Sequence, residues 1–373
     1  MGAALPARAA PDRLEMAAVR VRVPFRRPFA TAAGTYHARE TWIVRLRDGS
    51  GSVGHGEAGL APGADGAALE RLARSVRDAT AHAWHDGDLR PWLAPSPMDG
   101  ADDPIGLAVR AAIQGAALDL GLVGAGAAEA ATVEVNATIA GEDHAASVAD
   151  ARTAAAAGFR CLKLKVGSER TTAELVARIG AVREAVGPAL TLRLDANGAW
   201  DAATALERGT GVAAFGLEYL EQPIPSGVPA ELAELRHASP VAIAADEAVT
   251  SLGAARALLA ADAVDVLVIK PARVGGPAAA LAIAEAALAA GVGVTISTLL
   301  ETGVGLAAAA RVAAALPDRG HAHGLATGEL LADDLLATPL RVVDGRLGVP
   351  RPGLALDAAA IERWAVERAG DPW

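Results

Sequence analysis

The 373 residues predict an α/β protein in which a (β/α)8 TIM-type barrel follows an N-terminal α+β capping domain. Short apolar runs alternate with Ala-rich helical stretches over residues 131–338, and the front of the chain has its own strand-and-helix pattern. Charged residues also recur every 24 to 30 residues, once per strand-helix unit. A doubly wound open sheet is the rival fold, but no GxGxxG motif follows a strand.

The front of the chain, residues 1–130, is predicted to be the capping domain. Residues 1–15 are rich in Ala, Pro and Arg and lack the apolar core of a signal peptide, so we expect a loose tail. The small-residue stretch within 26–40 is expected to be a loop that either closes over a substrate or only connects two strands. Alternation and helical spacing predict the regular elements, which are strands at 18–23 and 41–47 and helices at 67–85 and 103–122.

The barrel is predicted over residues 131–338. Short apolar runs have the composition of buried strands, at 133–136, 161–165, 190–194, 217–221, 241–245, 264–269, 292–297 and, most weakly, 321–324. Longer Ala-rich segments have the length of helices, at 144–157, 169–186, 201–214, 229–238, 251–260, 276–290, 302–315 and 329–336. This alternation is typical of a parallel barrel. Residues 339–373 are predicted to return to the capping domain.

Composition narrows the function classes. The net charge of −10 argues against nucleic acid as a partner, because phosphate binding needs a basic face. The single cysteine, Cys161, excludes internal disulfides and fits a reducing cytoplasm, and its apolar setting predicts a buried, inert thiol. No uninterrupted apolar run approaches about 18 residues, so we expect no membrane span. A small-molecule substrate is therefore expected, and a homo-oligomer is left open.

Lysine is retained at three positions only, Lys163, Lys165 and Lys270, so the other 31 of the 34 basic residues are arginine. Codon bias accounts for the arginine excess but not for where the three lysines lie. Lys163 and Lys165 are two apart on one predicted strand, so their side chains point the same way. Lysine can lose its proton when it is desolvated or placed beside other cations, so we expect lowered lysine pKa values and roles in proton transfer.

Acidic residues end the strands that follow. Asp195, Glu221 and Asp246 each end or follow a predicted strand, and Lys270 ends the next one. The C-terminal ends of barrel strands meet at one face, where barrel enzymes build their sites. Three clustered carboxylates require a cation, and an all-oxygen ligand set suits Mg²⁺, with Mn²⁺ as a substitute. Such an ion can bind a substrate carboxylate and stabilise the dianionic enediolate that forms when the α-proton leaves.

Five further residues are expected near this face. Glu247 follows a predicted ligand and should point elsewhere, toward a hydrogen bond with a lysine. Asn197 either supports the site or only shapes a turn. Ser297, Thr298 and Glu301 follow the seventh strand and either orient substrate or serve packing.

These motifs together resemble the muconate lactonizing subgroup of the enolase superfamily, through Lys163-Leu-Lys165, Asp195-Ala-Asn197, Glu221-Gln-Pro223, Asp246-Glu247 and Lys270-Pro271. The resemblance extends over nearly the whole chain. It implies that the three acids Asp195, Glu221 and Asp246 hold Mg²⁺. It also implies that Lys165 is the principal base, that Lys163 supports it, and that Lys270 faces the other side of the substrate.

Within the subgroup, residues 133–139, 297–306 and 323–331 are most similar to the o-succinylbenzoate synthases. That similarity implies a carbon–oxygen lyase of menaquinone biosynthesis, acting by syn dehydration. Racemases or epimerases of N-succinylamino acids or dipeptides and muconate-type cycloisomerases are the alternatives, although Gly324-Leu-Ala326 lacks the acids that dipeptide epimerases carry there. The residues alone also leave a Schiff-base lyase and a non-catalytic barrel open.

Overall fold

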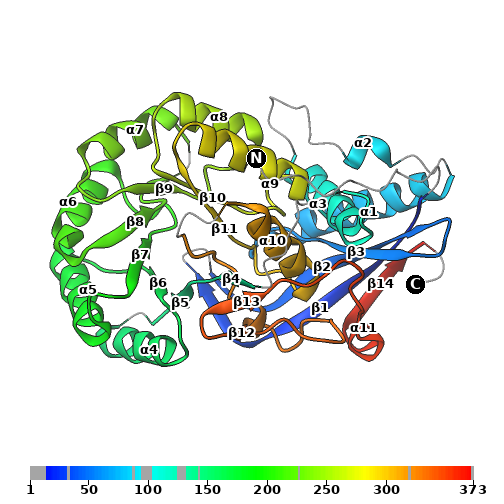
Figure 1. The fold of residues 1–373 in the computed structure, drawn as a ribbon, viewed down its shortest axis with the longest axis horizontal. Coiled ribbons are helices and arrows are strands. Elements are labelled where there is room, and N and C mark those ends of the chain that lie inside the picture. The colour runs from blue at the N-terminus through cyan, green and yellow to red at the C-terminus, as the bar shows by residue number, and fades with distance from the viewer. Residues whose placement is uncertain are drawn as a thin grey trace.

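The protein has two parts, a barrel and an antiparallel sheet with its own helices (Figure 1). The structure is a computed structural model and describes residues 14–31, 34–85, 89–93, 103–123, 132–141, 143–225, 227–317 and 321–370. Most of the expected tail and the segment 124–131 lie outside these ranges. None of the helices within them is long and apolar enough to cross a membrane.

The N-terminal part is an antiparallel sheet in the order β14-β1-β2-β3. Its strands are β1 (Leu14–Thr31), β2 (Gly34–Asp48), β3 (Val53–Ala58) and β14 (Ala365–Ala369). The sheet packs on helices α1 (Gly66–His85) and α3 (Pro104–Asp119), and the short helix α2 (Arg90–Leu93) packs on α3. Gly56 lets β3 approach α3 closely, because a Cβ there would lie 2.0 Å from the Ala112 carbonyl oxygen. The sheet and helices therefore share one apolar core.

The loop expected within residues 26–40 is not a loop where the structure describes it. β1 and β2 continue as a long hairpin, with Phe29 paired to Tyr36 and Thr31 paired to Gly34. A register irregularity between Pro24 and Phe29 interrupts the pairing, as expected where proline removes a backbone donor. The small residues at 30–31 and 34–35 are therefore paired at the ends of the two strands, and residues 32–33 lie outside the described part.

The barrel sheet is parallel and runs in the order β11-β10-β9-β8-β7-β6-β5. Its strands are β5 (Ala137–Ile139), β6 (Cys161–Lys165), β7 (Thr191–Asp195), β8 (Leu217–Glu221), β9 (Ile243–Ala245), β10 (Val266–Ile269) and β11 (Gly293–Ile296). Single parallel bridges join Ser297 to Gly324 and His323 to Val135. The weakly predicted eighth strand is thus reduced to residues that connect β11 with the start of the barrel.

Helices cover the outside of this sheet, as Figure 1 shows. They are α4 (His144–Ala156), α5 (Thr172–Val186), α6 (Ala202–Val212), α7 (Pro229–Ala238), α8 (Leu252–Ala260), α9 (Pro277–Ala289) and α10 (Gly303–Ala315). Their starts follow ordinary capping chemistry. Side-chain oxygens of Asp143, Thr171, Asp201, Ser251 and Thr302 cap backbone N–H groups, and α7 and α9 begin with proline. The predicted TIM-type barrel fold is confirmed.

Two expected elements of the barrel region differ. The first half of the run 133–136 belongs to β4 (Thr132–Glu134), which pairs with β13 (Arg346–Gly348) of the hairpin that β13 forms with β12 (Val342–Val343). The barrel strand β5 therefore lies farther along the chain. The helix expected at 329–336 is only a 3-10 turn, Gly328–Leu330. Asp333 and Asp334 accept backbone N–H bonds from Leu335 and Leu336, which favours turns over helix there.

Two buried carboxylates tie the N-terminal part to the barrel. Glu57 on β3 accepts hydrogen bonds from the Thr302 N–H and hydroxyl and from the Gly305 N–H, at the start of α10. Asp119 at the end of α3 accepts from Arg311 on α10 at 2.9 Å. From the C-terminal segment, α11 (Ala358–Trp364) precedes β14, which pairs with β1. The domain boundaries themselves stay a prediction.

Candidate active site

Parallel register brings the predicted residues to one end of the barrel. Lys165 pairs with Asp195 across β6 and β7, and Asp195 pairs with Glu221 across β7 and β8. These pairs lie at the C-terminal ends of the strands, an end called the mouth below. Adjacent parallel strands therefore hold the three side chains at the same level.

One lysine bridges two acids at the mouth. The Lys163 ammonium donates to Asp195 Oδ2 and to Glu221 Oε1, both at 2.8 Å. The Lys165 ammonium donates to the same Asp195 Oδ2 at 2.6 Å and to Asn197 Oδ1 at 2.7 Å. Lys163 is buried, whereas the Lys165 side chain is 34% exposed and so is the more accessible of the two.

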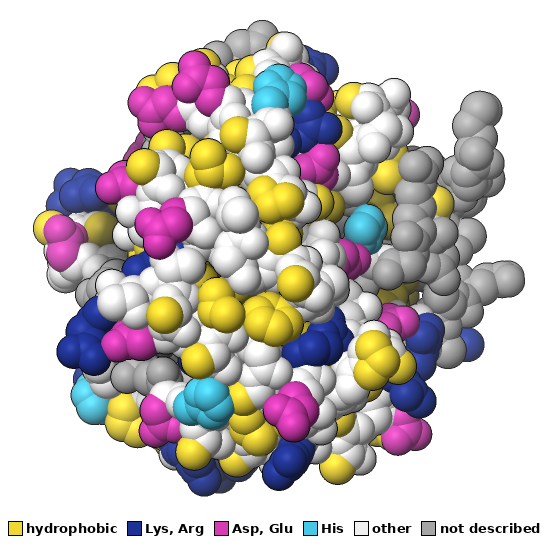
Figure 2. Space-filling model, turned by 90° about the vertical axis from the view of Figure 1, so that its left-hand side faces the viewer, with side chains coloured by type: hydrophobic (Ala, Val, Ile, Leu, Met, Phe, Trp, Pro, Cys, Tyr) yellow, Lys and Arg dark blue, Asp and Glu magenta, His cyan; other side chains and the backbone are white. Residues whose placement is uncertain are grey.

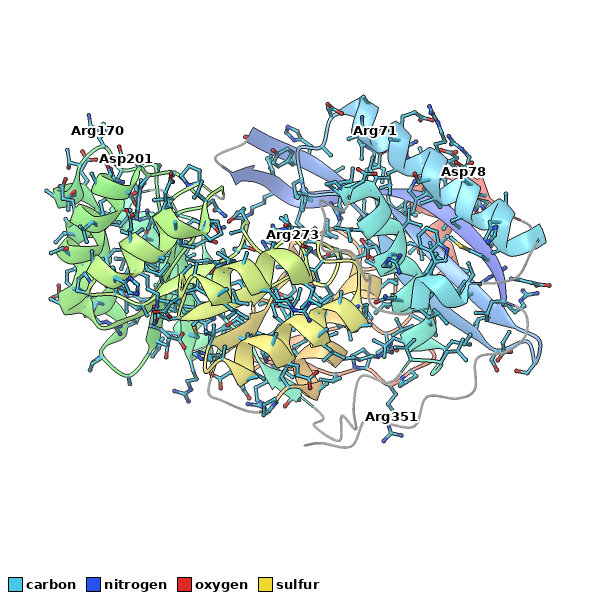
Figure 3. All side chains as sticks on the ribbon, turned by 90° about the horizontal axis from the view of Figure 1, so that it is seen from above. Arg71, Asp78, Arg170, Asp201, Arg273 and Arg351 are labelled. Atoms are coloured by element: carbon cyan, nitrogen blue, oxygen red, sulfur yellow. The ribbon has the colours of Figure 1, made fainter. Side chains whose placement is uncertain are left out.

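The third lysine binds the third acid. The Lys270 ammonium donates to Asp246 Oδ2 at 2.6 Å. Arg273 donates to the other oxygen, Asp246 Oδ1, at 2.7 Å and to the Asp246 backbone carbonyl at 2.8 Å. Figure 3 shows Arg273 near the middle of the molecule, where the barrel meets the N-terminal part. The six residues Lys163, Lys165, Asp195, Glu221, Asp246 and Lys270 are called the mouth cluster below.

The acids of the mouth cluster do not respond alike to burial. Burial acts to raise the pKa of Asp195, but the ammonium groups of Lys163 and Lys165 outweigh it and lower that pKa. Asp246 behaves similarly, since Lys270 and Arg273 lower its pKa against burial. Burial and then the negative charge of Asp195 raise the pKa of Glu221 to about 7. Glu221 is therefore the acid that the cluster leaves least stable in its charged form.

In the metal-free protein, the pKa of Lys163 moves in the opposite direction from the expected lowering. Burial does act to lower its pKa, but the carboxylates of Asp195 and Glu221, with a further contribution from Asp246, raise it well above the ordinary value. Lys163 is thus held as a cation by the acids around it. This arrangement suits a charge-stabilising role better than a role as proton acceptor.

Asn197 connects the exposed lysine to Glu247. Its side-chain N–H donates to Glu247 Oε1 at 2.9 Å, while its carbonyl oxygen accepts from Lys165. The backbone of Asn197 has a positive φ of 47°, a conformation that asparagine tolerates better than most residues. Glu247 therefore bonds to Asn197 and not directly to a lysine, which corrects the expected hydrogen bond.

Comparison with known proteins now identifies the family. A family model described as enolase C-terminal domain-like matches residues 146–360, more than half of the chain. The chain belongs to this enolase C-terminal domain-like family. All six residues of the mouth cluster lie inside the matched range.

Two relatives show which enzymes of the enolase family this chain is similar to. The chain is 43% identical over 202 residues to o-succinylbenzoate synthase of Thermobifida fusca (strain YX), covering 54% of this chain and 62% of that protein. It is 44% identical over 196 residues to o-succinylbenzoate synthase of Mycobacterium tuberculosis (strain ATCC 25618 / H37Rv), covering 52% and 57%. The matched part thus spans less than two thirds of these relatives.

Solved structures of the same subgroup match almost the entire chain. Muconate lactonizing enzyme from Pseudomonas fluorescens, complexed with muconolactone, superposes with a TM-score of 0.85 at 27% identity, covering 96% of this chain and all of that chain. Muconate lactonizing enzyme from Klebsiella pneumoniae gives a TM-score of 0.76 at 26% identity, covering 95% and all of that chain. These likenesses agree with the resemblance carried by the lysine and acid motifs.

Two residues of this enolase-family site, Gln222 and Arg273, were not predicted from the sequence to have a role. Gln222 has a positive φ of 39°, and its side-chain oxygen accepts from the backbone N–H groups of Asp246 at 3.0 Å and Ala248 at 3.1 Å. It thereby fixes the backbone that presents Asp246. Arg273 was detectable only as a basic residue three positions after Lys270, a weak signal in a chain with so many arginines.

The residues after β11 bond within the protein. Ser297 Oγ donates to the Gly324 carbonyl at 3.3 Å, and the Thr298 hydroxyl lies 3.0 Å from that of Thr327. Glu301 accepts a hydrogen bond from the Leu299 N–H, and burial raises its pKa. Their expected contact with substrate stays a prediction.

The described side chains on the face of the barrel away from the N-terminal part are of mixed type. Figure 2 shows acidic, basic and hydrophobic side chains interspersed on it. Such mixing is typical of a solvated surface. The buried mouth cluster is therefore the candidate site for chemistry in this protein.

Proposed function

We propose that this protein is an enzyme that removes the proton α to a substrate carboxylate, with Lys165 as the base. The observation that carries the proposal is the mouth cluster itself, in which the only three lysines of the chain meet three buried acids. Structural charges would be served as well by the abundant arginines. Lysine, unlike arginine, can exchange a proton near neutral pH when its surroundings permit.

We further propose the reaction named in the relatives, the formation of o-succinylbenzoate by a carbon–oxygen lyase. Lys165, as a neutral amine, takes the α-proton and leaves an enediolate, with the leaving hydroxyl on the same face as Lys165. The resulting ammonium returns that proton to the hydroxyl, so water leaves and a C=C bond forms. Lys163 and Lys270 keep their positive charges and stabilise the negative charge that develops on the substrate.

Asp195, Glu221 and Asp246 are the proposed ligands of a divalent metal, Mg²⁺ with Mn²⁺ as a substitute. Glu221 Oε2 is buried and has no hydrogen-bond partner among the described residues. This oxygen is therefore free to act as a ligand of a cation that prefers oxygen ligands, such as Mg²⁺. Within the same residues, no three His, Cys, Asp or Glu side chains already surround a common point as a metal site. Lysine ammonium groups bind the carboxylates instead, so we expect metal binding to replace some of these bonds. When bound, the metal would supply positive charge to the substrate carboxylate.

A second candidate is a racemase or epimerase of an N-acylated amino acid or dipeptide. Its basis is the position of two lysines at the ends of different strands. Lys165, at the end of β6, binds Asp195, and Lys270, directly after β10, binds Asp246, so each lysine could transfer a proton to or from the substrate. Dehydration needs one proton-transferring lysine, whereas racemisation needs both. Exchange of the α-proton in D₂O without loss of water would favour the racemase.

The test is direct. The purified protein, freed of metal with EDTA and then supplied with Mg²⁺ or Mn²⁺, is given the cyclohexadiene precursor of o-succinylbenzoate, and product is followed by absorbance and NMR. We expect turnover with either metal and none after EDTA. A borohydride-trapped lysine adduct that survives EDTA would instead support a Schiff-base lyase, and the absence of product with metal present would reject the synthase.

A further inference from the structure

A buried arginine outside the mouth cluster holds the backbone of Lys165. β6 ends at Lys165, and its neighbour β5 ends at Ile139, which pairs with Leu164. The Val166 N–H donates to the Asp195 carbonyl on the β7 side at 2.9 Å. In a trans peptide the carbonyl of Lys165 points the opposite way, beyond the end of β5. Arg178 Nη2 donates to that carbonyl at 2.9 Å and so takes the place of a missing strand partner.

The other bonds of Arg178 fix what surrounds this peptide. The same Nη2 donates to the Gly141 carbonyl, just past β5, at 2.6 Å, and Nε donates to Ser147 Oγ on α4 at 2.7 Å. Nη1 pairs with Glu169. A planar guanidinium can reach four groups in fixed directions, which a lysine ammonium at the same position cannot do. Arg178 thus joins the ends of β5 and β6 to helices α4 and α5.

Glu169 completes the clamp on the loop after the base. Its carboxylate accepts from the Gly167 N–H at 2.8 Å, and its backbone carbonyl accepts from Arg208 on α6 at 2.8 Å. Gly167 has a φ of 115°, where a side chain would be strained. The Arg178–Glu169 pair is 4% and 5% exposed, so its charges compensate each other away from solvent.

We propose that Arg178 is a positioning residue that fixes the peptide following Lys165 and thereby aims its ammonium at the reacting carbon. Arg178 touches the backbone of Lys165 and not its ammonium, which Asp195 and Asn197 hold. The inference rests on the proposed role of Lys165 as the base. Misplacing a catalytic group by about 1 Å can cost about 100-fold in rate, so a backbone clamp of this kind can control catalysis.

Arg183 offers a matched control on the same helix, α5. It also donates to backbone carbonyls, at 2.9 Å to Phe215 and at 2.7 Å to Leu190, but near the opposite end of the barrel strands. We expect Arg178→Gln to lower kcat by about 10- to 100-fold with KM changed by less than about threefold. Arg183→Gln should leave kcat within about twofold of the wild type, although both variants lose thermal stability.

A second readout does not depend on turnover. Because the chain has three lysines, protein labelled with ¹³C at lysine Cε gives one resolvable signal for each, assigned with single Lys→Arg variants. At fixed pH, Arg178→Gln should move the Lys165 signal more than those of Lys163 and Lys270, and Arg183→Gln should move none of the three. If Arg178→Gln does not fold, Arg178→Lys replaces it. The introduced lysine adds a fourth signal that the wild type lacks, and the other three signals should show the same pattern, since a lysine cannot reproduce the four-way bonding.

The outcomes separate the two proposals. A specific fall in kcat with a displaced Lys165 signal supports the positioning role. A wild type that never dehydrates the precursor, while Arg178→Gln still displaces the Lys165 signal, rejects the proposed reaction but keeps the clamp. Equal kcat and equal spectra in the Arg178 and Arg183 variants would overturn the inference, as would a uniform change in all three lysine signals.

Discussion

Two clusters of buried charge lie at opposite ends of the same barrel strands. On β7, Asp195 belongs to the mouth cluster, whereas Arg193 binds residues at the other end. On β8, Glu221 lies at the mouth and Glu218 lies three residues earlier. We call Arg193, Glu218 and His321 the lower cluster, in which Glu218 binds the arginine with one oxygen and His321 Nδ1 with the other at 2.7 Å.

The difference is visible in the two glutamates of β8. Burial acts to raise the pKa of Glu218, but His321 and Arg193 outweigh it and lower the pKa. Burial and neighbouring acids raise the pKa of Glu221 to about 7, and its Oε2 has no hydrogen-bond partner among the described residues. Glu218 thus has a hydrogen-bonded partner on each oxygen, although Arg193 Nη2 in the lower cluster is buried without a hydrogen-bond partner among the described residues. The mouth cluster instead keeps Glu221 under electrostatic stress, because burial and the neighbouring acids disfavour its charged form. Such stress is characteristic of sites that bind a metal or perform chemistry.

Loss of the proposed base should give the largest effect. We expect Lys165→Ala to reduce kcat for dehydration by about 1,000-fold or more, because no other group takes the α-proton. The fold should survive, since the Lys165 side chain is 34% exposed. Steady-state kinetics and circular dichroism measure the two properties, and substantial residual turnover would remove Lys165 from the base role.

A substitution that breaks the lower cluster should lower the stability of the fold. We expect Glu218→Gln to lower the free energy of unfolding by about 2 kcal/mol near pH 7, because it breaks a largely buried ion pair. The lowered pKa of Glu218 stabilises the fold above the carboxyl's unfolded value of about 4.3, and this contribution disappears as the pH falls through the folded pKa. Urea unfolding at pH 7 and pH 3 should therefore show the deficit shrinking in acid; an equal deficit at both values would argue against the pair.

The corresponding substitution in the mouth cluster should change the free energy of unfolding in the opposite direction. In metal-free protein, Glu221→Gln is expected to raise the free energy of unfolding at pH 8 by about 1 kcal/mol or more, because it removes a charge that the folded state disfavours. A raised carboxyl pKa costs stability as the pH rises from about 4.3, and the full cost is reached above about 7. The gain should therefore vanish below about pH 4. Destabilisation by Glu221→Gln at pH 8 would contradict the contrast between the clusters.

The smallest effect concerns the sulfur at the lower end of β6. Burial raises the pKa of the Cys161 thiol to about 12, so little thiolate exists at neutral pH. Iodoacetamide at pH 7.5 should leave the folded protein unlabelled and fully active, and labelling should appear only with unfolding. Rapid modification of the native protein, measured by mass spectrometry, would show that this end is more open than the structure indicates.

Much of the barrel and its mouth could be predicted because strand spacing is a local property. Buried parallel strands and their helices have characteristic lengths, so residues such as Asp195, Glu221 and Asp246 could be placed on one face without coordinates. The fold class and family are confirmed, while the roles of the site residues stay predictions. The eighth strand was the most weakly predicted, and in the structure its residues His323 and Gly324 form only single bridges.

What could not be predicted depends on contacts between distant segments. The hairpin ends near Phe29 read as a loop, because small residues favour turns until a partner strand pairs with them. The raised pKa of Lys163 depends on how closely the acids approach it, which spacing does not give. Arg178 was indistinguishable from other helix arginines until the ends of β5 and β6 were seen to meet it.

The central claim is that Lys165 takes the α-proton during dehydration. Its most direct test compares Mg²⁺-loaded wild type on the cyclohexadiene precursor of o-succinylbenzoate with hydrogen or deuterium at the α-carbon, monitored by NMR. We predict o-succinylbenzoate as the product in both cases, formed more slowly from the deuterated substrate, and formed by Lys165→Ala about 1,000-fold more slowly or not at all. Absence of product from the wild type, or equal rates of product formation by wild type and Lys165→Ala, would contradict the account.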